Sequence, residues 1–421
     1  MSVTSLHHPL IPVYEKYHLP NGLTVLLQQE NQTNLIAVCV LYKTGSRDES
    51  KGKTGIAHLF EHLMFSNCGP GIDFDSLLQN AGGDCNAFTT TDTTQYYSIG
   101  PANQLELILA LEANRISGFH ISKKDFKTQQ RVVLEEFSEM YLNNPYGMFS
   151  HEIMALAYKQ HPYQWPVIGE SQEVLSALTM QDAESFYHDY YHPSNAILVI
   201  SGKMDLDQAK RYVDKHFSSI KAGINKPRIY PTEPPLSEIR SLTVNKQLPE
   251  EAVYFAFPHC KRTDPDFYAI DFLTDVLAEG KSSLFYSILK KEKMLCSTVD
   301  CYITSTTDPG LIIFEAKVNP QYSIKEVESG FWEIVRQLQH HTIDDHNWEK
   351  YMNKNESAYL FSQLGLMNQA LNLSYAEWLG NPDLIFTELE NYKQLTPQKI
   401  KEAAIAYFSE IGYCKIYYRQ A

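Results

Sequence analysis

The spacing of apolar residues predicts short strands and amphipathic helices throughout the first half of the chain. Residues 14–30 read as a hairpin because two β-prone runs flank a Pro-Asn-Gly turn at 20–22, and the unbroken apolar run at 35–42 predicts a buried strand. Where apolar residues recur every three or four positions, the pattern predicts helices. The further predicted elements are helices over 54–66 and 73–81, strands near 86–90 and 94–99, helices over 103–117, 123–142 and 171–190, a strand at 196–201 and a helix over 205–217.

Beyond residue 220 a linker interrupts this pattern, and the same order of elements then returns. Residues 221–235 are rich in proline and show no periodicity, which is typical of an interdomain linker. We therefore predict an α+β protein of two homologous domains, each a mixed sheet covered by helices, with the domains at 1–220 and 241–421 and the linker at 221–240. The predicted elements of the second domain are a strand at 252–257, helices over 265–278 and 283–293, strands near 298–304 and 310–317, helices over 322–340, 344–362, 365–378 and 396–408, and a strand at 413–418.

Composition and charge narrow the class of protein. Hydrophobic residues make up 43% of the chain and charged residues 20%, which is typical of a globular protein. The formal net charge of −14 argues against nucleic-acid binding, which needs clustered Lys and Arg, and is compatible with basic or unfolded peptide partners or with a solvated acidic surface. No stretch approaches the ~20 apolar residues of a membrane span, so we predict none.

Cysteine usage and the N-terminal segment bear on location. The seven cysteines are odd in number and lack C-x-x-C spacing, which favours free thiols in a reducing compartment. The segment from Met1 to Pro12 lacks the basic stretch and apolar core of a signal peptide. We predict a cytoplasmic protein, with the periplasm as the alternative if a leader has been removed.

One predicted helix carries residues that ligate metals. His58 and His62 are four positions apart, so their rings project from one helix face and can reach a single zinc ion. Glu61 lies beside them, where a carboxylate can accept a proton from water activated by the metal. Thr54 is placed to cap the helix. The alternative is a helix with two surface histidines, because H-x-x-E-H arises by chance in roughly one such chain in thirty.

A catalytic zinc site needs a third protein ligand held on a separate element. Glu135 and Glu136 lie on the long helix predicted over 123–142, beside the apolar residues Val133 and Phe137. Either glutamate would complete the ligand set and leave the fourth position open for water. The pattern by itself does not choose between them.

Two further segments accompany these motifs, Gly82-Gly-Asp-Cys-Asn-Ala-Phe-Thr89 and Tyr191-His-Pro-Ser-Asn-Ala196. Over about residues 14–420 the chain resembles the pitrilysin/insulinase (M16) family of inverzincin peptidases, in the short two-domain branch that includes mitochondrial processing peptidase and bacterial relatives. The resemblance implies a zinc-dependent endopeptidase, with one zinc ion per chain, that hydrolyses unfolded peptides or short protein segments in an enclosed chamber.

The resemblance also implies the roles of individual residues. His58 and His62 match the zinc-ligand histidines of the family, and Glu61 matches its catalytic base. The family's third ligand is the glutamate just before an apolar residue, which is Glu136 in this chain.

Three more positions follow from the same comparison. Asn86 and Ala87 match the strand whose backbone is expected to pair with an extended peptide; the alternative for Asn86 is a turn or strand-end residue. The family usually carries a second glutamate seven positions before the third ligand, where this chain has Gln129. Glutamine still forms hydrogen bonds near the ligands but adds no negative charge.

The second half departs from the family at two positions. Catalytically complete members present an arginine and, seven residues later, a tyrosine that stabilise the oxyanion, whereas this chain has Lys290 and Ser297. Lysine lacks the planar fork of arginine, and serine is too short to replace a tyrosine hydroxyl. We therefore predict that the chain is half of a clamshell, a heterodimer whose paralogous subunit supplies the Arg–Tyr pair. A homodimer is the alternative.

Two other functions compete with the peptidase. A non-proteolytic assembly or scaffold subunit, like the core proteins of a respiratory complex, does not need four correctly spaced residues for zinc chemistry. A peptide-binding protein with structural zinc does not need a glutamate base or an open coordination position. We therefore predict a metalloendopeptidase subunit.

Overall fold

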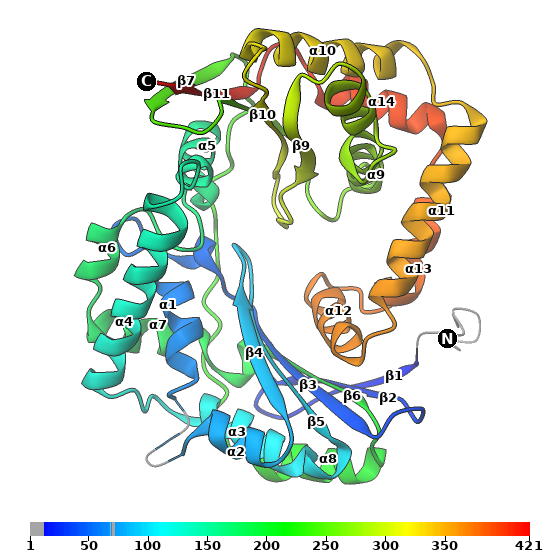
Figure 1. The fold of residues 1–421 in the computed structure, drawn as a ribbon. Coiled ribbons are helices and arrows are strands. Elements are labelled where there is room, and N and C mark those ends of the chain that lie inside the picture. Colours follow the sequence, from blue (N-terminus) through cyan, green and yellow to red (C-terminus); the bar gives the residue numbers. More distant parts are fainter. Residues whose placement is uncertain (1–11, 68, 70–71) are drawn as a thin grey trace. The chain divides into compact units, whose positions relative to one another are not determined.

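Two β-sheets organise the chain in the computed structural model, which describes residues 12–67, 69 and 72–421 (Figure 1). Each sheet is the centre of one compact unit. The N-terminal segment used to predict location and the thiol of Cys68 lie outside the described residues.

The sheet of unit 1 has six strands, and its order confirms several predicted elements. The strands β1 and β2 form the predicted antiparallel hairpin, β2 and β6 are parallel, and all other neighbours are antiparallel. β4 lies at one edge and pairs only with β5 among the described strands. The order is β1 (Tyr14–His18), β2 (Thr24–Gln29), β6 (Ala196–Gly202), β3 (Leu35–Tyr42), β5 (Thr94–Pro101) and β4 (Asp84–Thr89).

Both faces of this sheet are covered, which explains why β3 is apolar without alternation. The Sγ atom of Cys39 lies 3.6 Å from Oγ of Ser374, on helix α12 (Leu366–Trp378), so one face packs against that helix. On the other face, the hydroxyl of Tyr96 donates to the backbone carbonyl of Phe60, in helix α1 (Ile56–Met64), at 3.1 Å. Residues facing either way along β3 are therefore buried.

The sheet of unit 2 repeats the same order with one strand fewer. Strands β7 and β11 are the parallel pair, in the positions that β2 and β6 occupy in unit 1, and the remaining neighbours are antiparallel. The repeated topology confirms the prediction of two copies of one α+β unit. The order is β7 (Arg240–Lys246), β11 (Cys414–Gln420), β8 (Ala252–Pro258), β10 (Leu311–Val318) and β9 (Cys296–Ile303).

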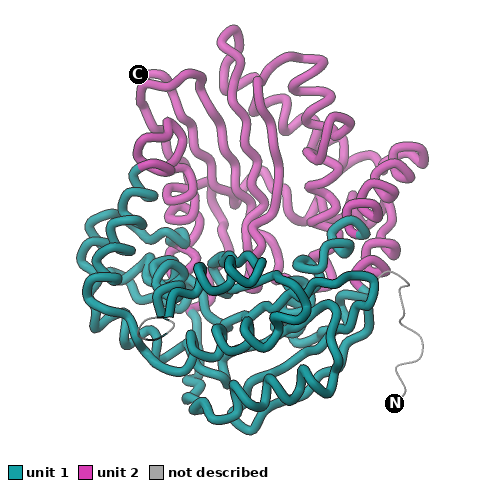
Figure 2. The backbone as a smooth tube through the Cα atoms, turned by 60° about the horizontal axis from the view of Figure 1, so that its bottom comes forward, with its two compact units in different colours: residues 1–138, 165–230, 360–387 teal, residues 139–164, 231–359, 388–421 magenta. Residues whose placement is uncertain are grey.

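Each sheet has one face covered by a helix from the other half of the sequence. Figure 2 shows the two units that result. Helix α12 packs on β3 and β6 of unit 1, although it follows the second sheet's central strands in the chain. Helix α5 (Phe149–Ala157) packs on β8 and β11 of unit 2, where the Phe149 ring stacks 4.0 Å from that of Tyr254. This exchange makes both units discontinuous in sequence.

The compact units are therefore cut differently from the predicted domains. Unit 1 comprises residues 1–138, 165–230 and 360–387, and unit 2 comprises 139–164, 231–359 and 388–421. The predicted linker is shared between them. The boundaries at 1–220 and 241–421 remain a proposal about how the repeat is laid out along the chain.

The remaining elements agree with the predicted ones except in a few places. The segment 171–190, predicted as one helix, forms two helices. The helix predicted over 123–142 ends at Phe137, and the chain continues from there in wider π-type turns. The sequence did not predict α5, α13 or β7. No helix among the described residues is long and apolar enough to cross a membrane. The other helices are α2 (Phe74–Asn80), α3 (Leu105–Ser117), α4 (Lys123–Phe137), α6 (Gln172–Ala177), α7 (Met180–Tyr190), α8 (Leu206–Phe217), α9 (Phe267–Ala278), α10 (Ile324–His340), α11 (Asp345–Ser362), α13 (Leu384–Lys393) and α14 (Pro397–Tyr407).

Candidate metal centre

Helix α1 is fixed by its apolar face, which leaves the opposite face free for chemistry. Leu59, Phe60 and Leu63 are buried, whereas His58 and His62 lie on the partly exposed side. The helix begins at Gly55, whose φ of 84° suits glycine and whose Cβ, if present, would lie 2.6 Å from a backbone oxygen. The start of the helix is thus set by close packing.

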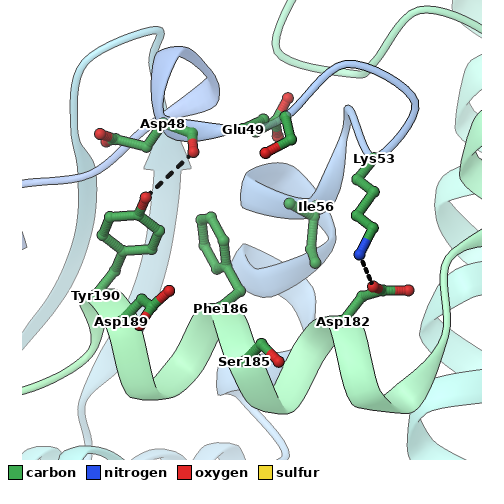
Figure 3. A pocket seen from close by; sticks show the side chains of 10 residues that line it. Asp48, Glu49, Lys53, Ile56, Asp182, Ser185, Phe186, Asp189 and Tyr190 are labelled. Atoms are coloured by element: carbon green, nitrogen blue, oxygen red, sulfur yellow. Dashed lines mark hydrogen bonds and ion pairs between the residues drawn. The ribbon is translucent and has the colours of Figure 1, made fainter. Parts of the chain in front are cut away.

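The N-terminus of α1 is capped by a carboxylate rather than by Thr54. Glu49 is buried and lies near Ile56 at the start of α1 (Figure 3). Its two oxygens accept hydrogen bonds from the backbone N–H groups of Gly55 at 3.0 Å and Ala57 at 2.8 Å. The prediction that Thr54 caps the helix is wrong, because its hydroxyl instead bonds to Glu170. Burial raises the pKa of Glu49 well above its usual range, and the two N–H groups oppose that rise.

We expect Glu49→Gln to destabilise α1 and weaken metal binding. An amide nitrogen would face a backbone N–H, so one buried donor loses its acceptor, which costs about 1–3 kcal/mol. Urea unfolding of the metal-free variant should show a lower midpoint, and zinc titration a weaker affinity. Glu184→Gln, an exposed change of the same charge on α7, should alter neither, and equal effects in both variants would contradict the capping role.

Helix α4 brings a glutamate to the histidines. Ser122 caps the helix by accepting a hydrogen bond from the Asp125 N–H, and Val133 and Phe137 are buried. Because Val133 and Phe137 are buried, Glu135 is left exposed to solvent and Glu136 is turned towards α1. The tertiary structure therefore distinguishes the two adjacent carboxylates that the pattern left open.

The three side chains His58, His62 and Glu136 converge on one point. An oxygen of Glu136 lies 3.9 Å from Nε2 of His58 and 3.6 Å from Nε2 of His62, and all three ligand atoms lie within 4.8 Å of one another. Ligand atoms bound tetrahedrally to zinc at 2.0–2.2 Å are about 3.4 Å apart, so only a small contraction is needed. No other group of three His, Cys, Asp or Glu residues comes this close among the described residues.

The pKa shifts of His58 and Glu136 favour the binding of a cation. Burial lowers the pKa of His58, although the nearby carboxylates of Glu136 and Glu61 oppose the shift. The hydrogen bond with His62 lowers the pKa of Glu136 against the effect of its burial. A neutral imidazole and an ionised carboxylate are the forms that ligate a metal ion.

Glu61 is oriented by strand β4. One of its carboxylate oxygens accepts a hydrogen bond from the Thr89 hydroxyl at 2.6 Å. The other oxygen has no hydrogen bond with the protein among the described residues and is available to accept a proton. Thr89 lies in a segment that carries the family resemblance, but its contact with Glu61 could not be inferred from the sequence.

The other predicted site residues lie on β4 and α4. Ala87 is buried, and Asn86 is exposed on the edge strand, where its side-chain oxygen accepts from the N–H of Ala87 at 2.8 Å. The strand assignment removes the alternative that Asn86 lies in a turn. Gln129 is partly buried on α4, two turns before Glu136.

In unit 2, Lys290 and Ser297 have their own partners. The ammonium of Lys290 lies 5.5 Å from the centre of the Tyr286 ring, and the hydroxyl of Ser297 donates to a carboxylate oxygen of Glu250 at 2.7 Å. Helix α9 follows β8 in unit 2, as α1 follows β3 in unit 1. The sequence of α9 is mostly apolar and contains no H-x-x-E-H pattern.

Comparison with known proteins identifies relatives over nearly the whole chain. Family models match residues 24–171, described as insulinase (peptidase family M16), and residues 177–355, described as the peptidase M16 inactive domain. The zinc protease PqqE of Helicobacter pylori is 32% identical over 383 residues, which cover 89% of this chain and 85% of that protein. The uncharacterised zinc protease YmxG of Bacillus subtilis is 25% identical over 71% of this chain and 72% of its own.

Solved structures share the fold. The crystal structure of a protease from Helicobacter pylori superposes with a TM-score of 0.91 at 27% identity, covering 97% of this chain and 100% of that one.

Proposed function

The chain belongs to the M16 family of peptidases, and on that premise we propose that it is a zinc-dependent endopeptidase subunit. The observation that supports this most is the convergence of His58, His62 and Glu136 beside Glu61. We assign the first three residues as the ligands of one zinc ion and Glu61 as the general base.

The donor set fits a catalytic zinc ion. Two imidazole nitrogens and one carboxylate oxygen leave a fourth tetrahedral position open, which distinguishes catalytic from structural zinc sites. Zinc bound there supplies Lewis acidity, which makes water more acidic and polarises the scissile carbonyl. Thr89 holds the Glu61 carboxylate in a fixed orientation, so its free oxygen can take a proton from water and deliver it to the leaving amine.

The substrate is expected to bind along β4. Because β4 pairs only with β5 among the described strands, the N–H and C=O groups of its outer edge can pair with an extended peptide. Asn86 and Ala87 lie in the middle of this edge, three and two residues before Thr89, which touches the base. A peptide that adds to the sheet here passes close to the ligands and to Glu61.

Activity also requires groups that stabilise the oxyanion. Lys290 and Ser297 do not reproduce an Arg–Tyr pair, and Ser297 is engaged with Glu250. We therefore propose that a paralogous chain supplies these donors and encloses the substrate together with this one. A homodimer remains the alternative arrangement.

We expect Glu136→Gln to lose its metal and Glu135→Gln to keep it. Removing one of three ligands from a partly buried zinc site abolishes useful affinity, whereas Glu135 is exposed and does not ligate. Metal analysis of the two purified variants after identical dialysis gives the comparison. Metal loss in Glu135→Gln alone would show that the wrong carboxylate is assigned.

A scaffold subunit is the competing function, because the second half matches a model described as an inactive domain. A peptidase assay with and without a chelator separates the two, since a scaffold has no chelator-sensitive activity. If the chain binds a full equivalent of zinc but cleaves no peptide, either alone or with any partner chain tested, the zinc has a structural role.

A further inference from the structure

The first part of the predicted linker is held against unit 1 by its side chains. Residues 221–230, which we call the strap, form neither helix nor strand and belong to unit 1. Most of them are exposed, whereas Arg228 and Tyr230 are partly buried. A segment without regular structure is ordered only by the contacts that it makes with its neighbours, so these two side chains determine where the strap lies.

Both side chains reach the same carboxylate, that of Asp48. A guanidinium nitrogen of Arg228 lies 3.3 Å from one oxygen of Asp48, and the hydroxyl of Tyr230 donates to the other oxygen at 2.5 Å. The carboxylate is 1% exposed and also accepts the backbone N–H of Gly45 at 3.1 Å. A buried carboxylate depends on such donors, so removing the two strap side chains would leave its charge short of partners.

Further contacts fix the same end of the strap. The Arg228 guanidinium also donates to the backbone carbonyl of Lys43 and to the side-chain oxygen of Asn195, the latter at 2.9 Å. The guanidinium of Arg47 lies 4.8 Å from the centre of the Tyr230 ring, within the range of a cation–π contact. The strap is therefore docked on unit 1 at one defined point.

This docking point adjoins the cap of the metal-binding helix. Asp48 is the last residue of a single 3-10 turn, Ser46–Asp48, and the next residue is Glu49. Figure 3 shows the side chains of Asp48 and Glu49 near the start of α1. Since Glu49 accepts two backbone N–H groups of α1, a shift of the turn also shifts the cap of that helix.

The same turn is bonded to the connection between β4 and β5. The N–H of Arg47 donates to the carbonyl of Thr91 at 2.9 Å, and the Arg47 guanidinium pairs with Asp92 at 2.8 Å. Both acceptors lie within three residues of Thr89, whose hydroxyl donates to Glu61. The turn thus joins the helix that carries the base to the strand that orients it.

We propose that Arg228 and Tyr230 are positioning residues of the peptidase, which hold the turn at Asp48 and so keep Glu61 aligned with Thr89. The inference rests on the proposed function and adds residues of the linker that act on the same site. Both residues act through Asp48 and take no direct part in bond cleavage. Because a displacement of about 1 Å at a reacting group can cost ~10²-fold in rate, a small shift of the turn is enough to matter.

Hydrogen exchange tests the coupling without requiring activity. In the variant Arg228→Ala/Tyr230→Phe, the N–H groups of Gly55 and Ala57, which donate to Glu49, should exchange about three- to tenfold faster than in the wild type, since lost hydrogen bonds lower the local stability. Tyr230→Phe alone, which removes a single hydroxyl, should give a smaller effect in the same direction.

Lys226→Ala is the matched control within the strap. It removes a side chain that pairs with Asp189 on α7 rather than with Asp48. Exchange at the start of α1 should stay at the wild-type rate in this variant. Unchanged exchange in the double variant, or equal acceleration in the control, overturns the proposal.

The effect on catalysis is measured with an internally quenched, unstructured peptide and the enzyme in its active form, alone or with its partner subunit, after zinc per chain has been verified. The variant Arg228→Ala/Tyr230→Phe should lower kcat about three- to thirtyfold and change KM by less than about twofold, because the base is misaligned while the edge of β4 is kept. Lys226→Ala should keep the wild-type kcat.

A second background separates alignment of the base from a general loss of structure. Thr89→Val removes the hydroxyl that orients Glu61, so the strap changes should lower kcat less in this background than in the wild type. An equal loss in both backgrounds, or strap variants that cleave at the wild-type kcat, overturns the positioning role and leaves the peptidase function standing. Absence of any chelator-sensitive cleavage by the wild type overturns the peptidase function and with it the catalytic role of the strap.

Discussion

Glu61→Gln is expected to keep the fold and the metal while losing ~10²–10⁴-fold in turnover. The amide has nearly the same size as the carboxylate and can still accept the Thr89 hydroxyl at its oxygen, so α1 and β4 keep their contact. It cannot take a proton from water. Because Glu61 is not one of the three residues whose ligand atoms converge, zinc should remain bound.

The measurement needs metal content, stability and rate on the same preparations. The variant should match the wild type in zinc per chain and in thermal midpoint, so that the loss of kcat/KM reports the base alone. Glu135→Gln makes the same chemical change on an exposed carboxylate and should leave the rate intact. Retention of more than about a tenth of wild-type turnover by Glu61→Gln would remove the residue from the assigned role.

The second large effect is expected from a partner chain. Donors that stabilise an oxyanion commonly account for ~10²–10³-fold in rate, and the matching positions in this chain hold Lys290 and Ser297. Since Ser297 donates to Glu250, it is already committed within unit 2. We expect the lone chain to be a weak peptidase and the mixture with a paralogue that keeps the Arg–Tyr pair to be about 10²–10³-fold faster.

This prediction is tested by titrating the candidate paralogue into a fixed amount of the chain. The rate should rise to a plateau at one partner per chain, and replacing the partner's arginine or tyrosine should return it to the level of the lone chain. Glu61→Gln in this chain should abolish the activity of the mixture, which would show that the catalytic zinc site lies in this chain. Full activity of the lone chain, unchanged by any partner, would support the homodimer instead.

The predicted elements that match the structure are those whose pattern depends on near neighbours in sequence. The hairpin over β1 and β2, the buried strand β3 and the helix with His58 and His62 follow from turn residues and from apolar spacing. Strand β7 was missed because its side chains are mostly exposed, which leaves no apolar signal. Helix α5 was missed because it is nine residues long and follows a turn.

Some residues of the candidate site could likewise be predicted from local spacing, and others only from the structure. Apolar spacing places His58, Glu61 and His62 on the free side of one helix, since the 3.6-residue turn sets their phase. The choice of Glu136 over Glu135 follows in the structure from the burial of Val133 and Phe137, which orients α4. Only an arrangement of separate elements can bring that carboxylate to within 3.6 Å of His62.

The sequence by itself therefore determined most of the strands and helices, the repeat, the histidine pair and the resemblance to M16 peptidases. Tertiary structure alone decided that Glu49 caps α1, that Thr89 orients Glu61, and that α12 and α5 each cover the sheet of the other half. The reason is physical. Periodicity records the shape of a local segment and which side of it is apolar, whereas these contacts join residues that meet only when distant segments bury their apolar faces against each other.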